Sequence, residues 1–245
     1  MDLVIGTLVL RPYVFVFLLA FVASGALDLG WKRTSLFGLW VWAVAWLAEF
    51  SSTRIGIPFG LYHYTEATRG RELYIANVPF MDSLSFVFLA YAAFCLARAA
   101  LGRHASGTAT VLLGGTLMMA LDVVIDPLAV RGDRWFLGRI FYYPDGGVYF
   151  GVPLSNFAGW LVVGIVGLGG YVVFVKSAGG RQPRYGVALY YGVLAFNLAV
   201  TAWIGERWLG VVGLLLHSVL AVVLWYRNGS AGAPMALGER GTQSA

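Results

Sequence analysis

Charged residues are scarce in this chain: Asp, Glu, Lys and Arg make up 12% of its 245 residues. Soluble domains carry about twice that share, roughly 25%. Hydrophobic residues reach 59% and aromatic residues 16%, a composition that excludes a disordered chain, a coiled coil and most soluble enzymes. Because one helical crossing of a membrane needs about 20 apolar residues, the chain has room for roughly seven or eight crossings and no separate soluble domain.

Cysteine, histidine and lysine are also rare, and each shortage excludes a kind of site. Cys95 is the only cysteine, which excludes a disulfide framework and a cysteine-rich metal site, and we expect it in the core. The three histidines lie in separate segments, unlike the clustered ligands of a membrane di-iron oxygenase, so an added hydroxyl group would come from water. Both lysines lie at span ends, which disfavours a retinal Schiff base. We predict neither a metal nor another cofactor.

Seven apolar segments predict an all-α fold, a polytopic transmembrane helical bundle. They cover approximately residues 13–29, 36–51, 82–101, 108–125, 156–176, 186–203 and 208–226. We expect one transmembrane domain over residues 1–227 and a disordered tail, rich in Gly, Ala and Ser, over residues 228–245. Two long connections, residues 53–79 and 126–153, contain many aromatic residues, Gly and Pro, and alternation of the spans places both on one face of the bundle.

The basic residues are scattered between apolar runs, so the net charge of +5 indicates helix anchoring rather than a nucleic-acid partner. Eight of them fall on the N-terminal side of the bundle and nine on the other side. Six of the eight lie in the long connections, and setting those aside leaves two against nine. The positive-inside rule then predicts a multi-pass protein of the cell (inner) membrane with its N-terminus outside.

Four carboxyl groups and one carboxamide are predicted at the end of the bundle that holds both long connections. They belong to Glu49, Asp82, Asp122, Asp126 and Asn156. Ionisable groups inside spans are costly and are therefore functional candidates. Structural roles remain open for three of them: Glu49 as an ion-pair partner of Arg54, Asp82 as a helix N-cap, and Asp126 as a helix end before a proline. Asp122 lies deeper and is harder to explain in this way.

Helix position predicts different charge states for these carboxyl groups. Glu49 and Asp126 lie at helix C-termini, where the dipole and burial both oppose an anion. Asp82 lies at a helix N-terminus, which favours its anion. One neutral acid and one anion in an apolar pocket form a general acid–base arrangement, and we expect at least one carboxyl group to be protonated at neutral pH.

Aromatic side chains are dense in both connections. They are Tyr62, Tyr64, Tyr74, Trp135, Phe136, Tyr142, Tyr143, Tyr149 and Phe150. One explanation is an interfacial aromatic belt. Another is the lining of a site for a flat apolar ligand, in which ring faces stabilise a cation.

Two stretches of the chain resemble a known family. They are residues 49–65, EFSSTRIGIPFGLYHYT, and residues 121–160, LDVVIDPLAVRGDRWFLGRIFYYPDGGVYFGVPLSNFAGW. Both are similar to the membrane carotenoid hydratases of the gamma-carotene and bisanhydrobacterioruberin hydratase type, often named carotenoid biosynthesis proteins. The similarity extends over about residues 27–225, and its most specific part runs from Asp122 to Trp160.

The resemblance implies an enzyme that adds water to the terminal isopropylidene double bond of an acyclic carotenoid end, as in gamma-carotene or lycopene, within the membrane lipid. Protonation of that alkene gives a tertiary carbocation, which water captures to form a tertiary alcohol. The reaction needs a buried acid, a pocket that tolerates a cation, and a positioned water with a base, but no cofactor.

The chain offers candidates for each of these roles. Asp122 or Asp126 is the expected acid, and Asp82 or Glu49 the group that positions water. Substrate-binding candidates at the same end of the bundle are Tyr62, Tyr64, Trp135, Tyr143, Asn156 and Arg54. The aromatic rings would shield the cation, the carboxamide would hold the water, and the arginine would tune Glu49.

Three other functions stay open on the residues alone. A carotenoid cyclase shares the protonation step but closes a ring without adding mass. A seven-helix transporter or receptor would bind an apolar ligand without turnover. A membrane prenyl-diphosphate enzyme would require magnesium at Asp122 and Asp126.

Overall fold

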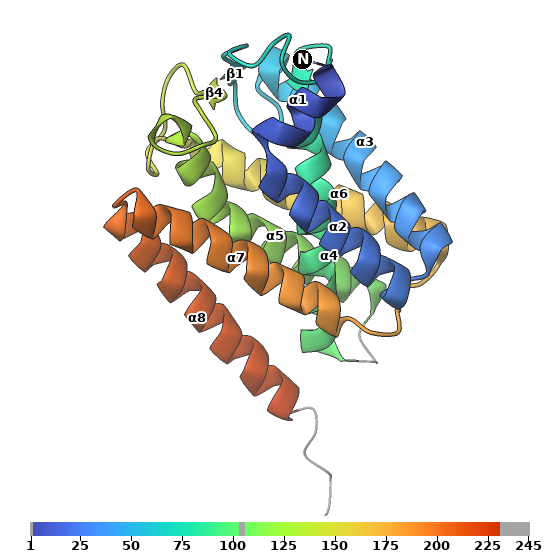
Figure 1. Cartoon of the computed structure of the whole chain (residues 1–245). Helices are drawn as coiled ribbons and strands as arrows, with labels where there is room; N and C mark the ends of the chain where they lie inside the picture. The colour runs from blue at the N-terminus through green and yellow to red at the C-terminus, as the bar shows by residue number, and fades with distance from the viewer. Residues whose placement is uncertain (1, 103–105, 231–245) are drawn as a thin grey trace, which may run out of the picture.

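Helices make up most of the part of the chain that the structure, a computed structural model, describes: residues 2–102 and 106–230 (Figure 1). In chain order they are α1 (Leu3–Leu10), α2 (Pro12–Asp28), α3 (Trp31–Ile55), α4 (Phe80–Leu101), α5 (Gly107–Ala129), α6 (Leu154–Val175), α7 (Arg184–Trp203) and α8 (Arg207–Ser230). The connections hold a 3₁₀ turn, η1 (Gly132–Arg134), and the short strands β1 (His63–Tyr64), β2 (Tyr74–Ile75), β3 (Val78–Pro79) and β4 (Phe141–Tyr142). The predicted all-α class is confirmed.

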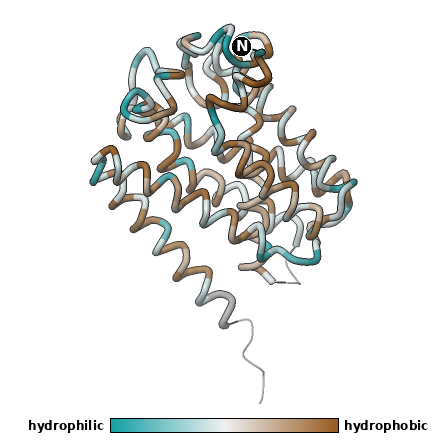
Figure 2. The backbone as a smooth tube through the Cα atoms, viewed as in Figure 1, coloured by the Kyte–Doolittle hydropathy of each residue, from teal (hydrophilic) through white to brown (hydrophobic). Residues whose placement is uncertain are grey.

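Six of the described helices, α3 to α8, are long and apolar enough to cross a membrane, and the bent pair of α1 and α2 gives up to seven. The prediction of about seven spans is confirmed. Figure 2 shows hydrophobic residues along the helices, with most hydrophilic stretches in the connections at the two ends of the bundle.

Helix α1 is an addition to the predicted spans, and it meets α2 at 89°. The break falls at Arg11, whose backbone is not helical. Pro12 then opens α2, a position where a residue without a backbone N–H is tolerated. The bend therefore leaves Arg11 at a corner of the chain.

Helix α5 does not end at the Asp126–Pro127 pair, as the sequence predicts, but continues to Ala129. Proline cannot donate a hydrogen bond to the carbonyl four residues earlier, which here belongs to Val123. The Tyr149 hydroxyl donates to that carbonyl instead, at 3.3 Å. A side chain from the second long connection thus supplies the missing donor, so Asp126 lies within the helix.

Both long connections lie at the same end of the bundle, near the N-terminus, and they are joined by a strand pair (Figure 1). Strand β1 pairs antiparallel with β4, with His63 opposite Tyr142 and Tyr64 opposite Phe141. Strand β2 pairs with β3 within the first connection. These pairs satisfy backbone groups that would otherwise be unpaired at the end of an apolar bundle.

Helix α5 packs closely on α6 through two glycines. A Cβ atom on Gly164 would lie 2.9 Å from the Cα atom of Gly115. The two helices run in opposite directions, so residues that follow Gly115 in α5 face residues that precede Gly164 in α6. Asp122 and Asp126 of α5 therefore lie opposite Asn156 and Trp160 of α6.

Two buried residues, Cys95 and Asp28, lie at the opposite end of the bundle. Cys95 is buried, as expected. Asp28 lies close to Lys32 and Arg33 in the sequence but pairs with Arg98 of α4, whose Nη1 lies 2.5 Å from Oδ2. The reason is burial: Asp28 is almost inaccessible, whereas Lys32 and Arg33 are exposed. Of the predicted tail, residues 228–230 continue α8, and residues 231–245 lie outside the described residues.

Candidate active site

A cavity of about 130 Å³ lies at the end of the bundle that holds the two long connections. One water needs roughly 10–15 Å³ on the same measure, so the cavity can hold water together with part of a larger ligand. Its lining comes from α2, α3, α4, α5, α6, α7 and both connections. Among the predicted site residues, it includes Glu49, Asp82, Asp126, Asn156, Tyr62, Tyr64, Trp135 and Tyr143.

Asn156 bridges the two aspartates of α5. Its Nδ2 donates to Asp122 Oδ2 and to Asp126 Oδ2, both at 2.7 Å. Trp160 Nε1 donates to Asp126 Oδ2 at 3.2 Å. Asp126 lines the cavity, whereas Asp122 is fully buried behind it and does not belong to the lining. The deepest predicted aspartate thus supports the site from behind instead of facing it.

Glu49 faces the cavity from α3 without a cation. The Tyr64 hydroxyl donates to its Oε1 at 3.3 Å, and its buried Oε2 has no hydrogen-bond partner among the described residues. Burial raises the pKa of the Tyr62 and Tyr64 hydroxyls well above their usual value, and the Glu49 carboxyl raises them further. Both tyrosines therefore stay neutral and can donate hydrogen bonds.

Arg54 does not contact Glu49, and the predicted pairing between them is wrong. The side chain is exposed; its Nη1 donates to Asn77 Oδ1 at 2.8 Å, and its guanidinium stacks 3.4 Å above the Phe50 ring. Residues five positions apart on an α-helix differ by about 140° in direction, so one of them faces the cavity and the other faces away. The role predicted for Arg54 therefore does not hold.

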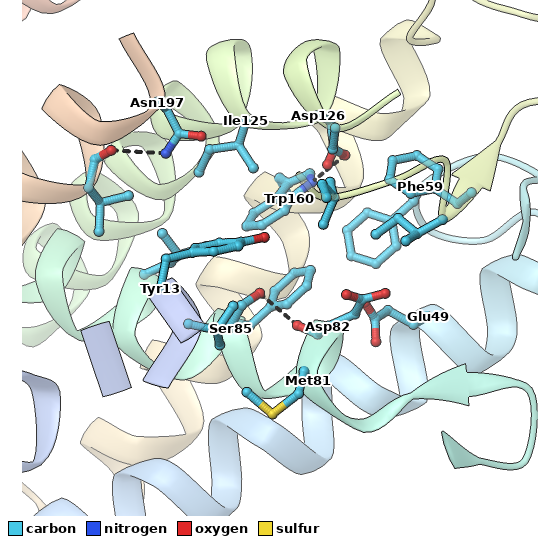
Figure 3. A pocket seen from close by; sticks show the side chains of 18 of the residues that line it. Tyr13, Glu49, Phe59, Met81, Asp82, Ser85, Ile125, Asp126, Trp160 and Asn197 are labelled. Atoms are coloured by element: carbon cyan, nitrogen blue, oxygen red, sulfur yellow. Dashed lines mark hydrogen bonds between the residues drawn. The ribbon is translucent and has the colours of Figure 1, made fainter. Parts of the chain in front are cut away.

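Asp82 lies in the first turn of α4, where Pro79 and not Asp82 occupies the N-cap position. The capping role left open for Asp82 is therefore wrong. Its carboxyl group forms an ion pair with Arg11 instead. Figure 3 shows Asp82 close to Glu49, and the two carboxyl groups interact electrostatically.

Arg11 and Glu72 are charged residues of this region that the sequence analysis does not predict, and the polar lining residues Ser85 and Asn197 were not predicted either. Arg11 Nη2 lies 2.7 Å from Glu72 Oε1, and both side chains are almost fully buried. The signal for Arg11 is present in the sequence as a charge inside an apolar stretch, which is costly unless it is paired. Glu72 gives no such signal because it lies in a polar connection.

Aromatic rings make up much of the remaining wall. Trp160 stacks on Phe86 with ring centroids 4.2 Å apart, and Phe59 lies 6.1 Å from Trp160. Tyr13 of α2 stacks on Phe196 of α7 at 5.1 Å and extends the lining away from the carboxyl groups. Other aromatic residues of the connections, such as Tyr149, lie outside the lining and support the backbone instead.

The comparisons with known proteins identify the family. The model of a family described as carotenoid biosynthesis protein matches residues 4–225. The chain belongs to the carotenoid biosynthesis protein family. A curated relative, bisanhydrobacterioruberin hydratase of Haloarcula japonica, is 35% identical over 120 residues, which is 48% of this chain and 38% of the relative. The match thus spans well under half of the relative's length, and no solved structure matches the chain.

This carotenoid biosynthesis protein combines two kinds of carboxyl group in one cavity. Asp82 has a cation partner, whereas Glu49 and Asp126 accept hydrogen bonds but form no ion pair among the described residues. A carboxyl group held by a cation is suited to act as an anion, and one without a cation is suited to carry a proton. With room for water and with aromatic faces in the lining, the arrangement is suited to acid–base chemistry on an apolar substrate.

Proposed function

We propose that this protein hydrates an acyclic carotenoid end, adding water across the terminal isopropylidene double bond to give a tertiary alcohol. The observation that carries the proposal is the presence of paired and unpaired carboxyl groups in one cavity with aromatic walls. Membership of the carotenoid biosynthesis protein family supports it, as does the relative that is named a hydratase. The substrate would lie in the lipid of the cell (inner) membrane, with the protein's N-terminus outside.

Asp126 is the proposed proton donor. Its O–H bond breaks as the proton is transferred to the less substituted alkene carbon, and the positive charge develops on the tertiary carbon. Asp126 is preferred to Asp122 because it lines the cavity. Asp122 would act through Asn156, which holds both carboxyl groups in place. Glu49 is the second candidate donor, since it also faces the cavity without a cation.

The cation would form beside aromatic faces. Trp160 donates to Asp126 through its Nε1 and stacks on Phe86, so both rings lie near the proposed donor. Tyr62, Tyr143 and Trp135 line the same cavity. Ring faces attract a cation by about 0.5–2 kcal/mol each, more where water is excluded.

Asp82 is the proposed base. A water oxygen forms the new bond to the tertiary carbon, and one of its protons passes to the Asp82 carboxylate. The donor has become an anion and the base has become neutral, and a proton returned between them through water restores both. The net reaction is therefore the alkene and one water giving one alcohol, without an oxidant or cofactor.

Expression in a lycopene-accumulating bacterium, followed by chromatography of the pigments with mass detection, tests this function. We expect the wild type to add the mass of one or two waters, and Asp126→Asn to lose the product by a factor of about 100 or more, the usual contribution of a general acid. Glu49→Gln tested in parallel decides between the two donors.

Other products would contradict the proposal. An isomer of unchanged mass would identify a cyclase, and a gain of oxygen alone would identify an oxygenase. A pigment bound but not converted, with lycopene and with gamma-carotene, would identify a binding protein. A product lost on chelation of magnesium and retained in Asp126→Asn would indicate chemistry that does not pass through this carboxyl group.

A further inference from the structure

Arg11 connects three separate parts of the chain at one buried point. It lies at the corner between α1 and α2, pairs through Nη2 with Glu72 of the first long connection, and pairs through Nη1 with Asp82 of α4. Only about 2% of the Arg11 side chain is accessible. An arginine keeps its charge in proteins, so its burial requires these partners.

Helix α1 is also held against the same connection. The Thr7 hydroxyl accepts a hydrogen bond from the backbone N–H of Leu73 at 2.8 Å, one residue after Glu72. Thr7 in turn donates to Leu3 of its own helix at 2.7 Å. Helix α1 is thus bound to the loop at Leu73 through Thr7, and the bend after α1 directs Arg11 toward Glu72 of the same loop.

We propose that Arg11 and Glu72 are positioning residues for Asp82 in the hydration reaction, an inference that rests on the proposed function. Arg11 holds the Asp82 carboxylate as an anion at the cavity wall. Glu72 fixes the other side of the guanidinium and offsets part of its positive charge. Asp82 can therefore remain ionised and still accept a proton from water.

The charge count explains why both partners are needed. One cation shared by two carboxylates leaves a net negative charge, whereas Arg11 alone on Asp82 would hold its anion more strongly and make it a weaker base. Without Arg11, two buried carboxyl groups would lie together uncompensated. The two substitutions should therefore change the basicity of Asp82 in opposite directions.

Other groups around Asp82 come from every neighbouring element. Glu49 of α3 and Asp126 of α5 carry the nearby carboxyl groups, and Tyr13 of α2 and Tyr64 of β1 carry the hydroxyl groups. None of these is a cation. Arg11 is thus the positive charge that distinguishes Asp82 from the other carboxyl groups of the cavity.

The test is the pH dependence of hydration by the full chain in lipid vesicles. Activity should fall at low pH as the Asp82 base becomes protonated. Arg11→Gln should move this acidic limb to higher pH, and Glu72→Gln should move it to lower pH, each by about one unit for the loss of one neighbouring charge. Arg11→Lys should bring the acidic limb most of the way back to its wild-type pH, because lysine keeps the positive charge. Recovery should be incomplete because lysine lacks the two-nitrogen fork that contacts both carboxylates.

Arg98→Gln is the matched control. Arg98 is also a buried arginine in an ion pair, with Asp28 at the opposite end of the bundle. We expect it to lower stability as Arg11→Gln does, but to leave the acidic limb unmoved. Thr7→Val, which removes the hydrogen bond to Leu73 without changing a charge, should lower the rate and leave the limb unmoved.

Infrared difference spectra between each protein and its Asp82→Asn form provide a readout apart from activity. We expect an ionised carboxylate signal for Asp82 at neutral pH, and a larger share of protonated carboxyl signal in Arg11→Gln. The inference would be overturned if the acidic limb moved in the same direction in Arg11→Gln and Glu72→Gln, or moved in neither. An unchanged ionised share of Asp82 in Arg11→Gln would also overturn it. If the wild type makes no hydrated product, the proposed function fails, and the infrared result still decides whether Arg11 keeps Asp82 ionised.

Discussion

Asn156 donates hydrogen bonds from one side-chain nitrogen to two carboxyl groups. The stability of this bridge depends on which carboxyl oxygens have a hydrogen-bond partner. Both Oδ2 atoms lie 2.7 Å from Nδ2, and Asp122 Oδ1 is buried without a partner among the described residues. A buried polar group left unpaired costs about 1–3 kcal/mol. Loss of the Asn156 carboxamide should therefore destabilise the Asp122 and Asp126 carboxyl groups.

We predict that Asn156→Leu lowers the free energy of unfolding by about 1–3 kcal/mol, because both carboxyl groups lose a donor. Hydration should fall on the order of tenfold or more, since a misplaced donor that weakens the transition state by about 1.4 kcal/mol costs a factor of ten. Thermal unfolding in detergent and product analysis measure the two effects. Asn77→Ala, which removes a partner of Arg54 outside the cavity, is the control and should retain the activity.

At the scale of elements, the register between α5 and α6 places the bridge. The contact of Gly164 with Gly115 brings the two backbones together, and the carboxyl groups face Asn156 and Trp160 from the neighbouring turns. Bulk at the glycine contact would separate these turns. The Tyr149 hydrogen bond to Val123 supports the same helix where Pro127 lacks a donor.

Substitution at the glycine contact should therefore reach the site from a distance. Gly164→Ala places a Cβ atom 2.9 Å from a backbone atom, which cannot rotate away, and we expect a loss of about 1–3 kcal/mol of stability together with reduced hydration. Gly192→Ala is the matched control, because a Cβ atom there would meet nothing within 4 Å. It should leave stability unchanged or raise it by up to about 1 kcal/mol. Equal losses in both variants would refute the role of the contact.

At the scale of the whole molecule, ion pairs connect the ends of the helices across the fold. Glu206, in the turn between α7 and α8, pairs with Arg134 and, at 3.1 Å, with Arg131 of the second long connection. Slight burial opposes its charge, but the hydrogen bonds and charges of the two arginines dominate and lower the pKa of Glu206. The turn is thus attached to the connection that forms part of the cavity wall.

The lowered pKa predicts a stability contribution that depends on pH. It is present above the usual glutamate pKa of about 4.3 and is lost as the pH falls through the lower folded value. Because the pair is partly exposed, we expect Glu206→Gln to cost at most about 1 kcal/mol at neutral pH. Thermal unfolding of both proteins at neutral pH and at about pH 2, below the folded value, checks this, and a difference that persists there would contradict it.

Much of the fold follows from local properties of the chain. Long apolar segments with few charges form helices in a membrane whatever their neighbours, so the predicted spans agree with α2 to α8. Alternation of the spans brings both long connections to one end, and with them Glu49, Asp82 and Asp126. The family match over residues 4–225 agrees with the resemblance seen in two stretches of sequence.

The partners of the charged groups depend on the tertiary structure instead. Whether Arg54 or Arg11 meets a carboxyl group is decided by the direction of a side chain around its helix and by a bend of 89° that composition does not record. Glu72 comes from a loop, where no periodic pattern constrains its position. The sequence by itself determined which residue types gather at one end of the bundle, because hydropathy acts locally. Only the tertiary structure decided which carboxyl group holds a cation, because a buried ion pair joins residues far apart in the chain.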